Sequence, residues 1–180
     1  CLALSFSWSF NSRKPASLML MGNIPLTEDR KPVNKRYFDA LPDSFRESAL
    51  LDRFHCFIEG WYLPRINKSM IYKGWTMNME YFSEIMHTLR VQNVYAELFD
   101  KLVDYDRKAG VREFTAVKRI ATAYIKLLFP HWISLEEVNL DEFDTFCLQP
   151  AIHRRGIIQE QCHYIDPEYK AEMPAIWVRR

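Results

Sequence analysis

The stretch "VREFTAVKRIATAYIKLLFP", residues 111–130, has the apolar spacing of one long amphipathic helix. Apolar residues return to one face every three or four positions, and Pro130 ends the pattern because proline cannot continue a helix. The residues of this face are Val111, Phe114, Val117, Ile120, Ala121, Tyr124 and Leu128. A helix with one apolar face must pack against other elements, so this stretch predicts a helical bundle.

The sequence on both sides of this stretch predicts further helices. Apolar residues at helical spacing indicate one helix from Met79 and another from Val94, separated by Gln92-Asn93, with Gly110 ending the second. After Pro130, "SLEE" at residues 134–137 has the spacing of a capping box, so a fourth helix is expected to run to about residue 148. A fifth is expected from about residue 150, where a proline suits the first turn.

The first 60 residues have a different character. "SLMLMGNIPL", residues 17–26, is a continuous apolar run between two prolines, the pattern of a strand buried on both faces in a parallel sheet. Short helical pieces are expected at residues 37–41 and 45–51, followed by a short strand in "HCFIEGW", residues 55–61. The connection up to residue 76 is punctuated by Gly and Pro and is expected to be a loop.

These patterns predict an α+β fold that is mostly α. Residues 1–60 are expected to be the C-terminal part of an α/β core, residues 61–76 a hinge, and residues 77–165 a helical domain. Residues 166–180 are expected to be a proline-containing tail, and the first residue, a cysteine, indicates a piece of a longer protein.

Composition excludes several classes of function. Of 180 residues, 24 are Lys or Arg and 23 are Asp or Glu, so the net charge of +1 favours neither a nucleic-acid coat nor a trap for acidic substrates. No apolar run is long enough to span a membrane. The four cysteines, at positions 1, 56, 147 and 162, lack paired spacing, which favours reduced thiols in a cytoplasmic protein and no metal site.

No phosphate-binding glycine loop, zinc motif or nucleophile motif occurs in the sequence. Asn23 directly follows the first predicted strand, where open parallel sheets bind ligands. An amide at that point could orient a water molecule or hold a phosphate oxygen. The alternative is that Gly22-Asn23 only turns the chain.

Two sets of basic residues are further candidates. Arg53 lies in "LLDRF" among apolar neighbours, which could present its guanidinium group to a phosphate on a neighbouring subunit, or it could pair with Glu47 or Asp52. Seven-residue spacing places three cations on one edge of the helix from residue 111, and a second basic cluster follows later in the chain. The alternative for both sets is solvated surface, which is the commoner outcome for a basic stripe. They are Arg112, Arg119 and Lys126, and His153, Arg154 and Arg155.

At this point the sequence shows a resemblance. "LMLMGNIPL", "ALPDSFRESALLDRFHCFIEGW", "AGVREFTAVKRIATAYIKLLFP", "FCLQPAIHRRGIIQEQ" and "YIDPEYKAEMP" resemble the Lon-related AAA+ proteins of the BREX phage-defence system, also called ATP-dependent Lon-type proteases. "ALLDRFHCFIEGW" is the most specific of these phrases. The pieces are also similar, more distantly, to the AAA+ modules of minichromosome-maintenance helicases.

The resemblance implies roles for four residues. Asn23 corresponds to sensor 1, Arg53 to the arginine finger and Arg112 to sensor 2, while Arg119 matches a recurrent basic position. It also implies that the segment is the end of an AAA+ core followed by its helical lid, and that the intact protein hydrolyses ATP with magnesium in a homo-oligomeric ring. The segment alone is expected to bind no cofactor and to lack activity, because the family's Walker A and Walker B segments lie upstream.

The resemblance leaves the partner open. It implies DNA as a partner of the ring and no membrane. An alternative is a non-enzymatic helical module that binds DNA or protein through the basic edges, and a third is the ATPase part of an ATP-dependent protease.

Overall fold

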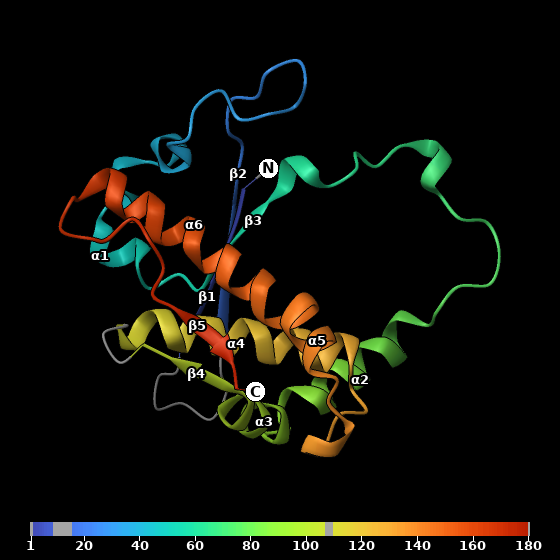
Figure 1. The fold of residues 1–180 in the computed structure, drawn as a ribbon. Helices are drawn as coiled ribbons and strands as arrows, with labels where there is room; N and C mark the ends of the chain where they lie inside the picture. Colours follow the sequence, from blue (N-terminus) through green and yellow to red (C-terminus); the bar gives the residue numbers. More distant parts are fainter. Residues whose placement is uncertain (1, 9–15, 107–109, 180) are drawn as a thin grey trace.

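The structure is a computed structural model, and it describes residues 2–8, 16–106 and 110–179 (Figure 1). Most of the elements in these ranges are helical, and five short strands within them form two small sheets. The expected α+β class with mostly α content is confirmed. No helix in the described ranges has both the length and the apolar character needed to cross a membrane.

The N-terminal sheet contains β1 (Leu2–Trp8), β2 (Ala16–Gly22) and β3 (Cys56–Glu59) in the order β2-β1-β3. Both outer strands run antiparallel to β1, so that Leu4 lies opposite Leu20 on one side and Phe57 on the other. The strands predicted at residues 17–22 and 55–61 are therefore confirmed in place.

The expectation that β2 is buried on both faces of a parallel sheet is wrong. Met19 is 58% exposed and Met21 is 74% exposed, whereas Leu20 between them packs against the core. Alternation of this kind belongs to a sheet with one covered face, and the methionines are apolar residues that the open face tolerates.

Short helical turns connect the sheet to the rest of the molecule. The two helical pieces predicted between residues 37 and 51 are confirmed, although the first is a 3₁₀ turn and the second splits into a 3₁₀ turn and one α turn. These elements are η1 (Tyr37–Ala40), η2 (Asp43–Phe45) and α1 (Ser48–Leu51), and two more 3₁₀ turns follow β3: η3 (Gly60–Tyr62) and η4 (Lys68–Met70).

The helices predicted from residue 79 onward are present. They are α2 (Met79–Arg90), α3 (Val94–Leu102) and α4 (Val111–Leu128). Asn78 caps α2 by accepting hydrogen bonds from two amides of its first turn. The prediction that the second helix ends at Gly110 is wrong, because α3 already ends at Leu102. The chain continues from there into β4 (Val103–Tyr105), which pairs with β5 (Ile176–Val178).

The C-terminal helices differ from the prediction at their junctions. The capping box of Ser134 and Glu137 is present, but it closes only η5 (Leu135–Glu137). Asn139 is the N-cap of the next helix, α5 (Leu140–Phe143). This helix continues without a break through the π-helical turn η6 (Asp144–Leu148) into α6 (Gln149–Ile165). Pro150 therefore lies within this continuous helical segment, directly after the wide turn, and no break separates the fourth and fifth predicted helices.

Helix α6 crosses the molecule between two hydrophobic clusters (Figure 1). Its N-terminal part packs with α3, α4 and β5, and its C-terminal part packs with α1, β3 and the turn at η1. Gln161 adds a polar link, because its side chain accepts from the amide of Tyr37 at 2.7 Å and donates to the carbonyl of Lys35 at 2.7 Å. The predicted domain limits remain a prediction, and α6 contacts elements on both sides of residue 76.

Candidate functional site

A pocket of about 230 Å³ lies between the turn after α1 and the first turns of α4. Three of the four candidate residues, Arg53, Arg112 and Arg119, line it. The two arginines on α4 lie seven residues apart, so two turns of helix bring them to the same face. The remaining lining residues are Asp52, His55, Val111, Thr115, Ala116 and Arg155.

The local sequence explains why Arg53 points outward. Leu51 and Phe54 on either side of it are buried in the hydrophobic cluster beneath α6, which fixes the backbone of the turn. The Arg53 side chain itself is exposed and makes no ion pair with a described residue. The alternative pairing of Arg53 with Glu47 or Asp52 is therefore wrong.

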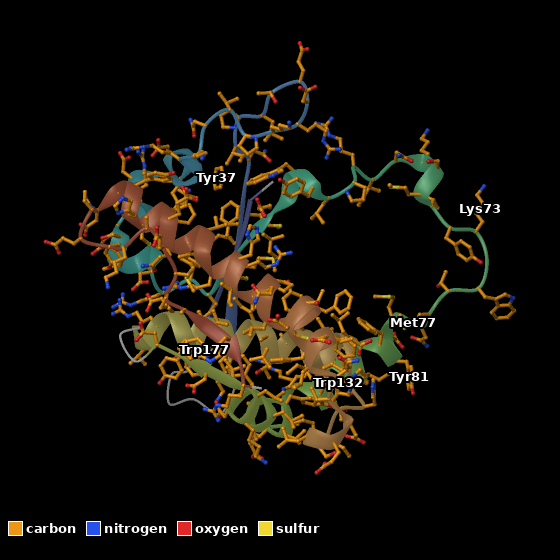
Figure 2. The ribbon with its side chains drawn as sticks, viewed as in Figure 1. Tyr37, Lys73, Met77, Tyr81, Trp132 and Trp177 are labelled. Atoms are coloured by element: carbon orange, nitrogen blue, oxygen red, sulfur yellow. The ribbon has the colours of Figure 1, made fainter. Side chains whose placement is uncertain are left out.

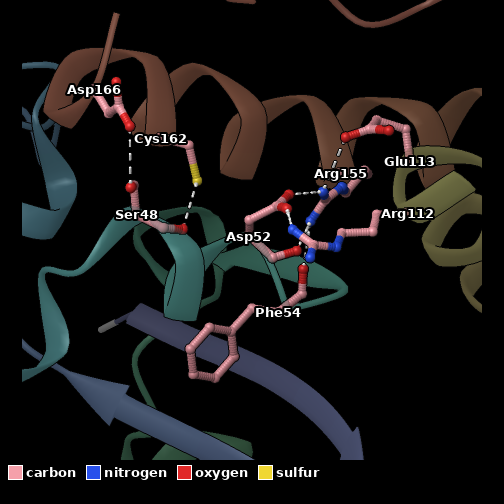
Figure 3. Close-up of polar contacts among 8 residues, drawn as sticks. All are labelled: Ser48, Asp52, Phe54, Arg112, Glu113, Arg155, Cys162 and Asp166. Atoms are coloured by element: carbon pink, nitrogen blue, oxygen red, sulfur yellow. Dashed lines mark hydrogen bonds and ion pairs between the residues drawn. The ribbon is translucent and has the colours of Figure 1, made fainter. Parts of the chain in front are cut away.

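Asp52 pairs instead with two arginines from the helical part of the chain (Figure 3). Its carboxylate is 3% exposed and contacts Arg112 through one oxygen and Arg155 through the other. The hydrogen bond and the negative charge of Asp52 raise the pKa of Arg112. The Arg112 side chain is still 57% exposed, so it lies at the mouth of the pocket with one face open to solvent.

Arg155 holds the backbone on both sides of Arg53. Its buried guanidinium group donates to the carbonyl oxygens of Asp52 at 2.9 Å and Phe54 at 2.7 Å (Figure 3). It also reaches the carboxylate of Glu113 at 3.4 Å. One side chain of α6 thus fixes the peptide units that flank Arg53, and it links them to the start of α4.

Arg119 contacts His55 at the other side of the pocket, with 2.6 Å between a guanidinium nitrogen and Nε2. Burial, together with the charges of Arg119 and Arg155, lowers the pKa of His55 from its ordinary 6.5 to about 4. The ring is therefore neutral at pH 7. Because guanidinium can only donate, Nε2 accepts and the ring proton lies on Nδ1.

The pocket is suited to an anion. Four guanidinium groups and one carboxylate line it, and that carboxylate is shared by Arg112 and Arg155. Arg53 and Arg119 have no acidic partner among the described residues. Planar guanidinium groups match the oxygens of phosphate, so the donor set fits a phosphoryl group. In the described ranges no three His, Cys, Asp or Glu side chains gather as a metal site.

The structure does not bring Asn23 to this pocket. Asn23 follows β2 as predicted, but its exposed side chain lines a separate pocket of about 320 Å³ with Arg36, Tyr37 and Asp39. Lys126 does not line the arginine pocket either. Its ammonium group donates to the carbonyl of Arg90 at 3.1 Å.

The second basic cluster is not a continuous exposed patch, since His153 is the one of its three side chains that is largely exposed. Arg155 is completely buried. Arg154 donates to the hydroxyl of Tyr124 at 2.7 Å, and His153 contacts Glu59 at 2.9 Å.

Glu113 and His55 had no role among the sequence-based expectations. Arg155 was expected only as part of a basic cluster, and Asp52 only as a partner for Arg53. A weak signal was available for Asp52, which interrupts the apolar run "ALLDRF". Charged residues inside such runs are expensive to bury alone, so they indicate a buried partner. The identity of that partner, about 100 residues away, has no local signature.

Comparisons with known proteins agree with this architecture. A family described as "Lon-like protease BrxL-like, ATPase domain" matches residues 6–175. Two similar proteins are the Lon-like protease BrxL of Escherichia coli O9:H4 (strain HS) and that of Bacillus cereus (strain H3081.97). Each is 25% identical over 147 residues, which cover 81% of this chain but 20% and 21% of those proteins.

The chain therefore spans about a fifth of the length of the curated relatives it matches. Residues 6–175 include the arginine pocket and every helix described above, and they stop just before β5. From this match over nearly its whole length, we conclude that the chain belongs to the family of ATPase domains of BrxL-like, Lon-like proteases.

Proposed function

We propose that the arginine pocket binds the phosphate groups of ATP, and that the chain is the C-terminal part of the AAA+ ATPase module of a Lon-like BREX protein. The observation that supports this most directly is the convergence of Arg53, Arg112 and Arg119 on one pocket. Membership of the ATPase-domain family supports ATP as the source of the phosphate.

In this proposal each arginine has a distinct part. Arg53 is exposed, has no described acidic partner and is held by a fixed backbone, so it can stabilise charge on the transferred phosphoryl group without reorganising. Arg112 would exchange part of its contact with Asp52 for a phosphate oxygen. Arg119, oriented by His55, would supply a third positive charge.

The shared pocket of Arg53 and Arg112 bears on which subunit's nucleotide each arginine contacts in the proposed ring. Because Arg53 and Arg112 line the same pocket, both would act on the same nucleotide. If Arg53 reaches the ATP of a neighbouring subunit, Arg112 does so too. Asn23 lines a different pocket, so its proposed role as sensor 1, orienting the attacking water, would be carried out at the nucleotide bound by its own subunit.

The same contacts offer a route from nucleotide to lid. Asp52 belongs to the core part, whereas Arg112 and Arg155 belong to the helical part. A phosphate that draws Arg112 away from Asp52 would loosen one of the two ion pairs that Asp52 makes with the helical part. The hinge at residues 61–76 would then permit a movement that couples hydrolysis to work.

The remaining expectations belong to the full-length protein. We propose a homo-oligomeric ring in the cytoplasm, with magnesium supplied to the nucleotide by residues outside this chain, and with DNA as a partner. A separate function as a DNA-binding module is less well supported, since Arg155 is buried and Lys126 contacts a backbone carbonyl. The word protease in the relatives' names describes those proteins.

The test is the ATPase rate of the full-length protein, with and without duplex DNA. Arg53→Ala should lower the rate by about a thousandfold, and Arg112→Ala and Arg119→Ala by about ten- to a hundredfold, while the oligomer persists. Lys126→Ala, on the same helix edge but outside the pocket, is the matched control and should leave the rate unchanged. An assembled Arg53→Ala protein with the normal rate would refute the proposal.

The chain by itself, residues 1–180, is expected to show no ATP hydrolysis. It carries no phosphate-binding glycine loop in its sequence, so the arginines have no nucleotide held in place for them. Turnover by the purified chain would contradict this expectation.

A further inference from the structure

Residues 60–79 form an arm that leaves the body of the molecule between β3 and α2 (Figures 1 and 2). The arm is anchored at its start, where Trp61 is buried and Arg30 donates to the carbonyl of Leu63 at 2.9 Å. Beyond this anchor the side chains extend into solvent, as Lys73 and Met77 show in Figure 2.

The arm exposes an unusual amount of apolar surface. Trp75 is 99% exposed, Ile66 is 92% exposed and Tyr62 is 78% exposed. Six more large apolar side chains of the arm are also exposed: Leu63, Met70, Ile71, Tyr72, Met77 and Met79. Single exposed apolar residues are common, but a contiguous series of this kind marks an interaction surface.

The arm also has a uniform charge. Between residues 60 and 79 it contains Arg65, Lys68 and Lys73 and no acidic residue. Its partner must therefore offer an apolar surface that carries negative charge.

A surface with those properties lies on the same chain. Residues 133–146, which form η5, α5 and the start of η6, contain five acidic residues and no Lys or Arg. Four of its apolar side chains are exposed, namely Ile133, Leu135, Leu140 and Phe146. We call residues 133–146 the acidic face. It matches the arm in both charge and hydrophobicity.

The two surfaces do not cover each other within one molecule, since the side chains of both remain exposed. A nucleic acid could contact the cations and stack on Tyr62, Tyr72 and Trp75. It would leave the aliphatic and methionine side chains of the arm without apolar cover, and these outnumber the aromatic ones. A second copy of the chain provides both apolar cover and negative charge.

We infer that the arm of one copy, residues 60–79, binds the acidic face, residues 133–146, of a second copy. A contact between two different surfaces of identical subunits can repeat from one copy to the next, and it closes into a ring when the rotation permits. The inference gives the proposed ring a contact surface and rests on that part of the proposed function.

The test uses charge reversal in the full-length protein, with assembly measured by light scattering over a concentration series. Lys68→Glu with Lys73→Glu should weaken assembly by about tenfold or more, because like charges would then face each other. Glu136→Lys with Glu142→Lys should do the same. Combining all four substitutions should restore assembly to within about threefold of the original.

A matched control reverses two exposed lysines outside the arm, Lys31→Glu with Lys170→Glu, and should assemble normally. A second measurement mixes full-length protein carrying Lys68→Cys with a differently tagged protein carrying Asp141→Cys. Under mild oxidation a disulfide between the two tagged chains is expected, and it should be absent when the second protein carries Lys170→Cys instead.

Three results would overturn the inference. They are normal assembly of both charge-reversed proteins, absence of the disulfide between the tagged chains, and loss of DNA affinity in the arm variants with assembly unchanged. Failure of the proposed function is a different result, because Arg53→Ala would then hydrolyse ATP normally in an intact assembly. Assembly and hydrolysis are therefore measured separately for every variant.

Discussion

Asp52 and Arg155 form an ion pair that is closed to solvent on both sides, with side chains 3% and 1% exposed. They lie about 100 residues apart in the sequence, on the turn after α1 and in the middle of α6. The same guanidinium group binds the carbonyl oxygens on both sides of Arg53. A buried structural contact and the exposed candidate arginine finger are therefore parts of one arrangement.

Replacing Arg155 with Met should be strongly destabilising. The substitution leaves the Asp52 carboxylate buried and without one of its partners, which costs about 3–5 kcal/mol in the free energy of unfolding. Denaturant unfolding of the full-length protein, followed in the region of this domain, would measure the loss. Arg154→Met, at a neighbouring half-buried arginine with neutral partners, is the control and should cost about 1 kcal/mol. Equal small losses from both variants would contradict the arrangement.

Replacing Arg53 with Ala should hardly change stability. The side chain is exposed and has no described ion-pair partner, so the expected change in the free energy of unfolding is within about 0.5 kcal/mol. Asp52→Ala beside it should cost about 3 kcal/mol or more, because Arg155 would lose its buried counter-charge. Thermal unfolding of the two variants separates these cases, and a large loss from Arg53→Ala would show that its role is structural.

Stability should depend on pH through His55. Its pKa in the folded protein is about 4, below the ordinary 6.5, so the unfolded chain binds more protons between these values. Stability is therefore fully present above pH 6.5 and falls as the pH drops toward 4. We expect about 1–2 kcal/mol from this residue, after allowing for partial solvent exposure of the ring.

The measurement is the free energy of unfolding at several pH values, for the original protein and for His55→Gln. Glutamine keeps an oxygen that can accept from Arg119 but does not titrate in this range. The difference in the free energy of unfolding between the two proteins should change between pH 6.5 and pH 4, and it should be constant above pH 6.5. Parallel pH profiles would show that His55 is not buried in its neutral form.

Gln161 should contribute measurably to stability, since it is 1% exposed and its amide group satisfies backbone groups of the η1 turn. Gln161→Leu leaves the Tyr37 amide and the Lys35 carbonyl without this partner, and should cost about 1–3 kcal/mol. Hydrogen exchange would localise the effect, because the Tyr37 amide should lose protection while amides in α4 keep theirs. Uniform loss across both regions would contradict a local role.

Two of the cysteines should resist thiol reagents. Burial raises the pKa of Cys147 and of Cys162 to about 12, so neither thiol ionises near neutral pH. Cys56 forms no disulfide with a described residue and is less buried, whereas Cys1 lies outside the described residues. Mass spectrometry after brief alkylation should show label on Cys56 well before the other two, and denaturant should remove the difference. Equal labelling in the native protein would contradict their burial.

Several features of the fold follow from the sequence because they depend on residues close together. The face of α4 was predictable from spacing within one helix, and its buried members are Val117, Ile120, Ala121 and their neighbours. The burial of the residues at the two ends of α4 was not predictable from spacing, since Val111 is 83% exposed and Leu128 is 52% exposed. Whether an apolar residue at a helix end is covered depends on what the next element does, and spacing carries no information about that.

Part of the candidate site was also predictable. The resemblance pointed to Arg53, Arg112 and Arg119 as separate functional positions, and the structure places all three around one pocket. It placed Asn23 in the same machinery, whereas the structure sets it in another pocket. The residues that orient the arginines, His55 and Arg155, gave no comparable signal, because supporting roles arise from contacts between distant segments.

The sequence by itself determined the helical spacing, the capping at Asn78 and at Ser134, and the family, because these depend on local geometry or on ordered motifs. Only the tertiary structure decided that β2 pairs antiparallel with β1, that β4 pairs with β5, and that Arg155 closes on Asp52. The pairings of β4 with β5 and of Arg155 with Asp52 join distant parts of the chain, whereas β1 and β2 are close in sequence. All three are selected by the burial and hydrogen bonding of the whole fold. No local preference of either partner specifies them.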